Sequence, residues 1–289
     1  MSFSSTLAPP HRLLIEPLVR NALLEDLGRA GDVTSDAIAP QGAQARAVLA
    51  ARQEGVLAGL ELARLAFELV DPCVNFMVEQ DDGARVGAGG RLATIEGPAR
   101  AILTAERTAL NFLSHLSGIA TVTATIVAAV SGTNARVVCT RKTTPGLRAV
   151  EKYAVRAGGG ANHRFGLDDA ILIKDNHVAL AGSVGEAVRR AKAAAGHLVK
   201  IELEVDTLDQ LEQALKEGVD AVLLDNMTTA QLREAVAMVD GRAICEASGR
   251  ITPQTAAAVA ATGVDVISAG WLTHSAPILD IGLDFEAAQ

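Results

Sequence analysis

The chain beyond Gly132 repeats one pattern of apolar and polar positions six times. Each repeat opens with a short apolar run that ends next to a polar residue, and a helical stretch follows. The six runs are residues 135–139, 170–173, 199–205, 221–224, 243–247 and 264–267. Strands that alternate with helices through short connections predict a parallel sheet with right-handed crossovers. We therefore expect an α/β fold whose second part closes, fully or incompletely, into a parallel barrel.

The first third of the chain mixes helical and extended patterns. Apolar positions between Leu13 and Leu23 predict a helix, and residues 60–70 predict a second, amphipathic one. Residues 43–52 and 74–80 have the composition of strands. This mixture predicts an α+β module.

Residues 98–130 have a continuous helical pattern. Pro98 suits the first turn of a helix. Gly118 and Gly132 are expected to break the pattern, which predicts two helices in succession.

The length of 289 residues suits a barrel of about 250 residues, or a barrel with a smaller partner domain. We place an N-terminal α/β sandwich domain at residues 1–116 and the barrel domain at 117–274. The C-terminal residues 275–289 are expected to pack on the N-terminal domain.

The composition excludes several classes of protein. Lys and Arg number 26 against 34 Asp and Glu, so the net charge of -8 argues against general nucleic-acid binding, which needs a basic face. No run of about 18 uninterrupted apolar residues predicts a membrane span, and residues 1–10 lack the basic start of an export signal. Three widely spaced cysteines indicate neither a disulfide framework nor a zinc site. We expect a cytoplasmic protein.

Cationic residues are concentrated between Thr140 and His177, despite the acidic balance of the whole chain. Three short segments carry them: Thr140-Arg141-Lys142, Asn162-His163-Arg164 and Lys174-Asp175-Asn176-His177. The polar residues follow predicted strands, and the carboxyl ends of strands are where barrel enzymes have their active sites. Side chains of this type predict a site for a ligand with several negative charges.

Two carboxylates follow neighbouring strands. In the run 200–205 the period of two places Lys200, Glu202 and Glu204 on one face, and Glu204, nearest the end, is the better candidate for function. Glu202 is expected to be an internal salt-bridge partner. Asp225 follows the next strand and could share a Mg²⁺ ion with Glu204, although an Asp at such a position can equally cap the next helix.

Small residues end the last two predicted strands. Ser248-Gly249-Arg250 and Ser268-Ala269-Gly270 could bring backbone N–H groups close to a phosphate, or they could be helix entries without a ligand. Gly158-Gly159-Gly160 matches no dinucleotide or P-loop motif. His177 and His274 follow strand-like runs and could contact a site, whereas the histidines outside these motifs are expected to be surface or packing residues.

Several segments together closely resemble the quinolinate phosphoribosyltransferase family, and they cover nearly the whole chain. The segments with the most distinctive motifs are residues 140–148, 151–160, 162–164 and 173–177. Further matching segments are residues 25–26, 31–35, 106–112, 202–206, 224–226, 246–249 and 265–270. The resemblance implies an N-terminal α/β sandwich and an incomplete, open α/β barrel. It also implies transfer of a phosphoribosyl group from phosphoribosyl pyrophosphate (PRPP) to quinolinate with loss of CO₂, in the biosynthesis of NAD.

The resemblance further implies a role for each site residue. The dicarboxylate pocket would be lined by Thr140, Arg141, His163, Arg164 and Lys174, with Arg107 added from the neighbouring subunit of a homodimer or larger oligomer. PRPP and Mg²⁺ would face Lys142, Glu204 and Asp225 as the catalytic set, with the two carboxylates on the metal directly or through water. The 5′-phosphate would lie against Ser248, Gly249, Arg250, Ser268, Ala269 and Gly270.

Two other functions would fit the same sequence pattern. One is a relative of the same fold that is associated with molybdenum transport genes. The complete dicarboxylate cluster argues against this function. The other is a non-catalytic barrel that binds a phosphorylated metabolite. Lys142, Glu204 and Asp225 favour catalysis, because a binding protein needs no carboxylates placed for a metal.

Overall fold

The computed structural model describes residues 7–286 and divides into two compact units. Unit 1 comprises Met1–Ala124, Thr143–Gly159 and Thr273–Gln289, and unit 2 comprises Thr125–Lys142 and Gly160–Leu272. The division differs from the expected boundary after residue 116, because the segment that begins at Thr143 returns to unit 1. Its helix is tied there by buried polar contacts, which are described below.

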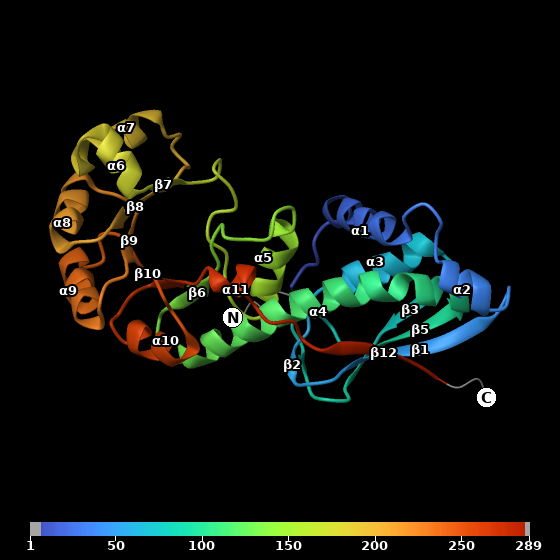
Figure 1. Ribbon diagram of the computed structural model, residues 1–289. Helices are drawn as coiled ribbons and strands as arrows, with labels where there is room; N and C mark the ends of the chain where they lie inside the picture. Colours follow the sequence, from blue (N-terminus) through green and yellow to red (C-terminus); the bar gives the residue numbers. More distant parts are fainter. Residues whose placement is uncertain (1–6, 287–289) are drawn as a thin grey trace. The chain divides into compact units, whose positions relative to one another are not determined.

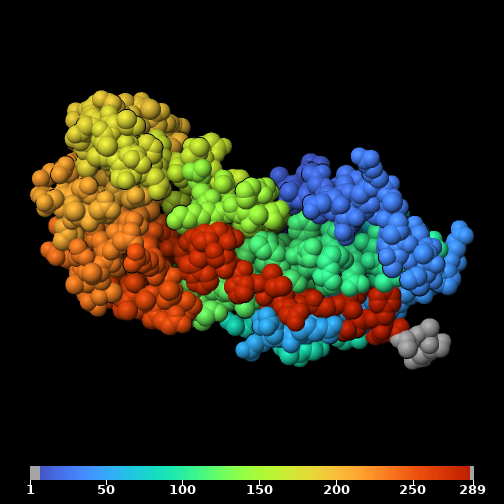
Figure 2. All heavy atoms as spheres, viewed as in Figure 1, coloured from blue at the N-terminus to red at the C-terminus, as the bar shows by residue number. Residues whose placement is uncertain are grey.

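Unit 1 contains a four-stranded antiparallel sheet in the order β12-β1-β5-β3. These strands are β1 (Gln44–Ala51), β3 (Asn75–Val78), β5 (Arg91–Pro98) and β12 (Ile281–Phe285). β12 pairs with β1 from Ala47↔Phe285 to Ala51↔Ile281, so the C-terminal segment forms an edge of this sheet, as the red residues beside the blue ones in Figure 2 show. A separate two-stranded ladder joins β2 (Gly55–Val56) to β4 (Arg85–Val86).

Unit 1 contains the helices α1 (Arg12–Leu27), α2 (Val33–Ile38), α3 (Leu60–Val70) and α5 (Arg148–Ala157). It also contains α4 (Ala99–Ala129) as far as Ala124, and the end of that helix belongs to unit 2. α1 confirms the helix predicted between Leu13 and Leu23, although Leu13 is 79% exposed and Leu14 is 59% exposed. The buried face consists of Ile15, Val19 and Leu23, which are spaced by four residues and therefore lie on one side of the helix.

α4 corrects the prediction of two helices. It runs unbroken through Gly118, and Pro98 is the last residue of β5 instead of the first turn of the helix. A Cβ atom at Gly118 would lie 2.0 Å from the carbonyl oxygen of Pro277, so this glycine permits close packing and does not end the helix. α4 is long and apolar enough to span a membrane by length and composition, and 56% of its apolar 18-residue window is buried. The packing in this structure accounts for that composition.

Unit 2 contains a six-stranded parallel sheet in the order β6-β11-β10-β9-β8-β7. The strands are β6 (Arg136–Val138), β7 (Ile171–Ile173), β8 (Ile201–Val205), β9 (Ala221–Asp225), β10 (Ile244–Ser248) and β11 (Val266–Ser268). Each lies within one residue of a predicted apolar run or inside it. β6 and β7 are the two ends of the order, so the described sheet is an open barrel, and the predicted fold class is confirmed.

Helices follow the strands of unit 2 and lie on the outer side of the sheet (Figure 1). They are α6 (Asp175–Ala181), α7 (Val184–Ala194), α8 (Leu208–Glu217), α9 (Thr229–Val239) and α10 (Pro253–Ala260). The short helix α11 (Trp271–His274) follows β11 at the point where the chain passes from unit 2 to unit 1. The parallel register brings the carboxyl ends of the strands to one edge of the sheet, where the polar residues that follow them converge.

Candidate active site

A cavity of about 250 Å³ lies among the carboxyl ends of the strands of unit 2. Apart from Leu172, Leu223 and Glu246, every residue that lines it was predicted from the sequence. The lining consists of Thr140, Arg141, Lys142, His163, Arg164, Leu172, Lys174, Glu204, Leu223, Asp225, Glu246, Ser248 and Ser268. The structure thus brings together cations from three separate segments of the chain in one cavity.

The cationic side chains are held by local backbone geometry. The hydroxyl of Thr140 accepts a hydrogen bond from the Lys142 N–H at 3.0 Å, which fixes the turn that presents Arg141. The guanidinium of Arg164 donates to the carbonyl oxygen of Ala170 at 3.0 Å. Burial, and next the nearby charge of Arg141, lower the pKa of Arg164. Two guanidinium groups that repel each other in a partly buried site favour an anion between or beside them.

The two predicted carboxylates both line this cavity. Glu204 Oε2 lies 2.9 Å from the Nζ atom of Lys174, and only 14% of the Glu204 side chain is exposed. Asp225 accepts a hydrogen bond from the amide of Asn226 at 2.6 Å. The alternative that Asp225 caps a helix is wrong, because the helix after it, α9, is capped by Thr228. Asp225 therefore remains available to a ligand in the cavity.

Behind these residues, His163 contacts two buried carboxyl groups. Its Nε2 atom lies 3.0 Å from Glu202 Oε2 and 3.5 Å from Glu246 Oε2. Burial, and next the neighbouring carboxylate of Glu202, raise the pKa of Glu246 to about 7, while His163 opposes that rise. Glu202 is thus an internal partner, as its position in the strand predicts.

The predicted phosphate segments differ from one another. At Ser248-Gly249-Arg250 the backbone turns through left-handed φ values of 95° at Gly249 and 51° at Arg250, and a Cβ at Gly249 would lie 2.3 Å from the Asn226 side-chain oxygen. In the other segment, the Ala269 N–H already donates to the Val138 carbonyl at 3.1 Å. Only Ser248 and Ser268 from these two segments line the cavity, whereas Gly249, Arg250, Ala269 and Gly270 do not.

Sequence reasoning missed Leu172, Leu223 and Glu246 as lining residues. Each of them lies two positions before a predicted site residue. Leu172 precedes Lys174, Leu223 precedes Asp225, and Glu246 precedes Ser248. Side chains two apart on a strand share a face, so the strand period was the signal that could have found them.

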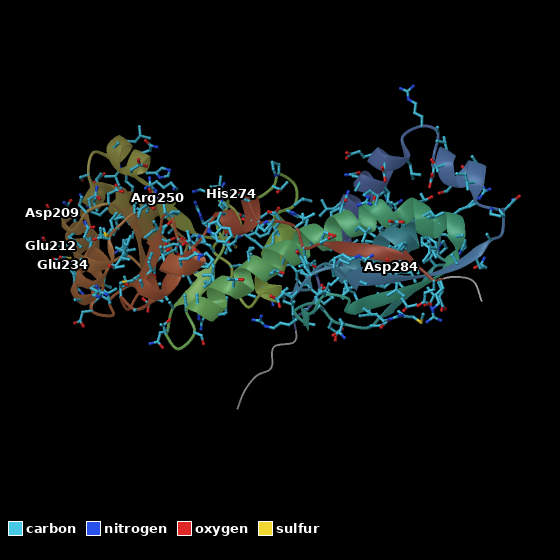
Figure 3. The ribbon with its side chains drawn as sticks, turned by 60° about the horizontal axis from the view of Figure 1, so that its bottom comes forward. Asp209, Glu212, Glu234, Arg250, His274 and Asp284 are labelled. Carbon is cyan, nitrogen blue, oxygen red and sulfur yellow. The ribbon has the colours of Figure 1, made fainter. Side chains whose placement is uncertain are left out.

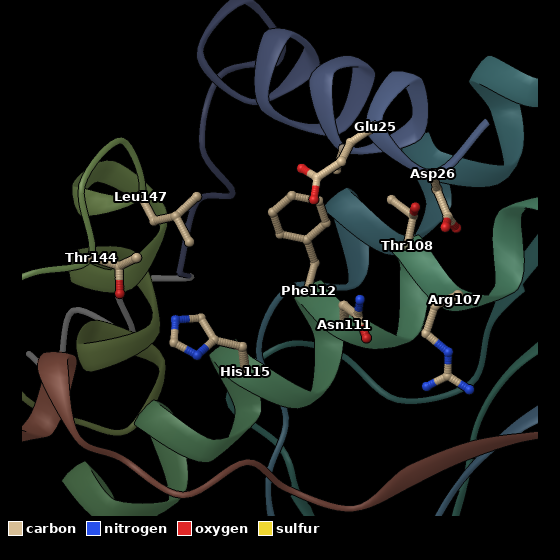
Figure 4. Close-up of a pocket in the computed structure, with 10 residues that line it drawn as sticks. Glu25, Asp26, Arg107, Thr108, Asn111, Phe112, His115, Thr144 and Leu147 are labelled. Carbon is tan, nitrogen blue, oxygen red and sulfur yellow. The ribbon is translucent and has the colours of Figure 1, made fainter. Parts of the chain in front are cut away.

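Arg107 lies in unit 1 and lines a different cavity of about 500 Å³ (Figure 4). Glu25 and Asp26 of α1 share its wall, as do Asn111 and His115 of α4. Arg107 is exposed, so it can meet a ligand or another protein surface. Arg107 is not among the residues that line the cavity of unit 2.

His115 is more than a packing residue. Its Nε2 atom lies 2.9 Å from Glu151 Oε1, and Glu151 is fully buried. The other oxygen of Glu151 accepts the Thr144 N–H at 3.1 Å. These contacts, with the bond from the Tyr153 hydroxyl to Asp82 at 2.7 Å, attach α5 and its preceding loop to unit 1.

The two remaining candidate histidines lie outside the cationic cavity. His177 accepts the backbone N–H of Lys174 at 2.8 Å and so caps the start of α6. His274 is exposed and pairs with the Ser275 hydroxyl. Figure 3 labels His274 together with Arg250.

The chain matches known proteins over most of its length. Models of the N-terminal and C-terminal domains of quinolinate phosphoribosyl transferase match residues 32–117 and 119–284. The chain is 49% identical to the nicotinate-nucleotide pyrophosphorylase [carboxylating] of Mycobacterium leprae (strain TN), over 92% of this chain and 95% of the relative. It is 44% identical to a probable enzyme of the same name from Bacillus subtilis (strain 168), over 95% and 94% of the two chains.

Solved structures give the same result. NadC from Streptococcus pyogenes superimposes with a TM-score of 0.92 at 42% identity, over 97% of this chain and all of that one. The nicotinate-nucleotide pyrophosphorylase from Francisella tularensis superimposes with a TM-score of 0.93 at 37% identity, over 98% of this chain and all of that one. With both domain models matched end to end, the chain belongs to the quinolinate phosphoribosyl transferase family.

Proposed function

We propose that the cationic cavity of unit 2 is where this chain transfers the phosphoribosyl group of PRPP to quinolinate and releases CO₂. The products are nicotinate mononucleotide and pyrophosphate, and the reaction belongs to NAD biosynthesis. One observation carries the assignment of the site: Arg141, Lys142, Arg164 and Lys174 all line one cavity of about 250 Å³. Glu204 and Asp225 line the same cavity, so it offers cations to the anionic substrates and carboxylates to their metal ion.

Quinolinate would bind between the arginine side chains. Each guanidinium can form two parallel hydrogen bonds to a carboxylate, and Lys174 adds a third cation. The lowered pKa of Arg164 supports this role, since an anion would relieve the repulsion from Arg141. Leu172 and Leu223 supply apolar contact for the ring in a cavity that is otherwise polar. A monocarboxylate would leave one cation of this partly buried site without its partner.

The reaction needs two bond exchanges. The ring nitrogen of quinolinate uses its lone pair to form a bond to C1 of the ribose, while the bond from C1 to pyrophosphate breaks and its electrons leave with pyrophosphate. The ribosylated ring nitrogen is then cationic. When the 2-carboxylate leaves as CO₂, its bonding electrons remain on C2, the positive ring stabilises them, and C2 takes up a proton. Lys142 would offset the charge that develops on pyrophosphate.

The oxygens of Glu204 and Asp225 fit Mg²⁺, which usually takes one or two carboxylates from a protein. Both side chains line the cavity from neighbouring strands, β8 and β9. When bound, Mg²⁺ would stabilise negative charge on the pyrophosphate oxygens. Glu204 is paired with Lys174 in this structure, so that pair would open as Glu204 turns to the metal and Lys174 to a substrate carboxylate. Ser248 and Ser268 would hold the 5′-phosphate through their hydroxyls, as part of the set with Gly249, Arg250, Ala269 and Gly270.

The proposal includes a cytoplasmic homodimer in which Arg107 of one protomer completes the cavity of the other. The exposure of Arg107, and its distance in the chain from the cations of unit 2, support a role between protomers. Mixing Arg107→Ala and Arg141→Ala subunits tests it. If Arg107 acts across the interface, random re-association restores about a quarter of the activity, because half of the dimers are mixed and each has one intact site. If both residues act in one protomer, mixing restores nothing.

The activity itself is tested with purified protein, quinolinate, PRPP and Mg²⁺, by following CO₂ and the mononucleotide together. Arg141→Ala should abolish turnover, whereas Arg189→Ala, at a side chain that is 62% exposed on α7, should retain it. Nicotinic acid should react far more slowly than quinolinate, and comparable rates would refute the dicarboxylate site. Binding without turnover would instead support the non-catalytic barrel.

A further inference from the structure

Asn226 contacts two parts of the proposed PRPP site at once. It directly follows Asp225, the last residue of β9, and lies beside the segment Ser248–Arg250 at the end of β10. The parallel register pairs Ser248 with Asp225, so the ends of the two strands are neighbours. In the proposed function Asp225 faces the metal and pyrophosphate of PRPP, whereas Ser248 holds its 5′-phosphate. Asn226 therefore lies between groups that would bind opposite ends of one substrate.

Three contacts attach Asn226 to both parts. Its Nδ2 atom donates a hydrogen bond to Asp225 Oδ2 at 2.6 Å, which restrains the carboxylate. Its backbone N–H donates to the carbonyl oxygen of Ser248 at 3.1 Å. Its side-chain oxygen fills the space beside Gly249, where an added Cβ would collide with Oδ1 and lie 3.0 Å from the Asn226 nitrogen. One residue thus contacts both the carboxylate and the phosphate segment.

The backbone of Asn226 is in the left-handed region, with a φ of 52°. Asparagine adopts this conformation more readily than most residues that have a Cβ. Glycine adopts it without steric cost but has no side chain. Asn226→Gly should therefore keep the turn and remove the side-chain contacts, so the role of the side chain can be tested by itself.

The other end of the phosphate segment is held independently of Asn226. Trp271 Nε1 donates to the carbonyl oxygen of Ile251 at 2.7 Å. Thr252 caps α10 through its hydroxyl, which accepts the N–H of Thr255. The segment thus has an anchor on each side, and the anchor at Asn226 also holds a carboxylate that lines the cavity.

A direct contact between Asn226 and PRPP is the competing explanation. Asn226 is exposed but is not among the residues that line the cavity, whereas Asp225 and Ser248 are. A carboxylate only accepts hydrogen bonds, so the amide nitrogen of Asn226 is the atom that meets Asp225, and the amide oxygen then faces Gly249. Both ends of the amide are turned to protein groups, which favours an indirect role.

We propose that Asn226 is a positioning residue, which holds Asp225 and the Ser248–Arg250 segment at the separation that PRPP requires. The inference deepens the proposed function and rests on it for the identity of the substrate. A ligand held at two points gains affinity because attachment at one point raises its effective concentration at the other, and this gain depends on the spacing of the points. Loss of the Asn226 side chain should therefore weaken PRPP much more than a ligand that uses one point alone.

The first test measures binding without turnover, by isothermal titration calorimetry with Mg²⁺ and no quinolinate. PRPP is compared with pyrophosphate and with ribose 5-phosphate, which each carry one end of it. Asn226→Gly should weaken PRPP about tenfold, but pyrophosphate and ribose 5-phosphate each less than about threefold. A loss for either half as large as the loss for PRPP, or no loss for PRPP, would overturn the proposal.

Asp240→Gly is the matched control for this test. Asp240 also has a positive φ, of 47°, but it is exposed at the end of α9 and does not line the cavity. The control should bind all three ligands as the wild type does. Asn226→Ala lacks the same side-chain amide, so it should show the same order of losses and decides the matter if Asn226→Gly does not fold.

The second test is kinetic and separates positioning from a general loss of structure. Asn226→Gly should raise the KM for PRPP about tenfold and change the KM for quinolinate less than about twofold. Equal changes in both KM values would contradict the proposal. A wild type that binds no PRPP would overturn the proposed function and this inference with it, whereas equal PRPP affinity in the wild type and Asn226→Gly would overturn this inference alone.

Discussion

Gly118 is the position where one added methyl group should have the clearest effect on stability. It lies inside α4, where alanine is normally preferred to glycine by about 1 kcal/mol. A Cβ at this position would lie 2.0 Å from the Pro277 carbonyl oxygen and 2.9 Å from the Ile278 Cα. Both contacts are with backbone, so no side-chain rotation can relieve them. The C-terminal segment that leads into β12 must move instead.

The expected cost follows from these contacts. Overfilling a packed site costs about 1–3 kcal/mol. Moving Pro277 also strains the adjacent bond from the Leu279 N–H to the Ser114 carbonyl at 3.0 Å. Loss of such a bond adds about 1 kcal/mol. Against the helix preference of about 1 kcal/mol, Gly118→Ala should destabilise the protein by about 2 kcal/mol in total. That corresponds to a fall in Tm of about 4–8 °C.

Calorimetry of the full chain measures this change, with Gly185→Ala as the control. Gly185 is also helical, in α7, but its added Cβ would meet only Glu217 Oε1 at 2.9 Å, the end of a flexible side chain. The control should therefore keep its Tm or raise it by about 2 °C, as helix preference alone predicts. If both variants have the same Tm, the close approach of the C-terminal segment does not explain Gly118.

Three further predictions concern buried or paired charges. Glu151→Ala leaves His115 without its partner and should lower the free energy of unfolding by about 3 kcal/mol in urea titrations; a loss below about 1 kcal/mol would contradict the buried pair. Lys174→Ala removes the ion pair with Glu204, in which the lysine side chain is 49% exposed, so the free energy of unfolding should change by less than about 0.5 kcal/mol. The KM for quinolinate should rise at least about tenfold, because a cation of the substrate site is lost. A large loss of stability with an unchanged KM would show that Lys174 is structural and does not bind substrate. The pKa of Glu246 is raised above its unfolded value to about 7, so its contribution to stability is full below about pH 4.5 and is lost as pH rises through about 7. The Tm of Glu246→Gln should therefore gain on that of the wild type between pH 5 and pH 8, and a constant difference would contradict the raised pKa.

The strands of unit 2 could be predicted because each is an apolar run bounded by polar residues. Such runs are typical of strands that are buried on both faces, so their position in the sequence is informative. The helical pattern of residues 98–130 was equally clear, but the break predicted at Gly118 was wrong, because α4 continues through it. Glycine in a helix can mark an end or a close contact, and only the three-dimensional structure shows that the backbone at Pro277 lies against Gly118.

The second segment of unit 1 that begins at Thr143 could not be predicted from local pattern. Its attachment depends on Glu151, which is fully buried against His115 and the Thr144 N–H. In sequence, Glu151 is an ordinary helical glutamate that could face solvent. Long-range pairing of a buried charge leaves no periodic signal, because its partner comes from a helix more than thirty residues away.

Position along a strand, and not residue type, decides what the charged residues of β8 do. Lys200 precedes the strand and forms an exposed pair with Asp220 at 2.5 Å, on the side where the strand begins. Glu202, in its middle, is buried against His163, and Glu204, near its end, reaches Lys174 beside the cavity. The period of two puts all three on one face, but the carboxyl end of the strand is where ligands bind. The same rule applies to β10, where Glu246 lies below Ser248. A chemical role in this fold is therefore assigned most securely to the last polar residue of each strand, while the residue two positions earlier on the same face supports it from beneath.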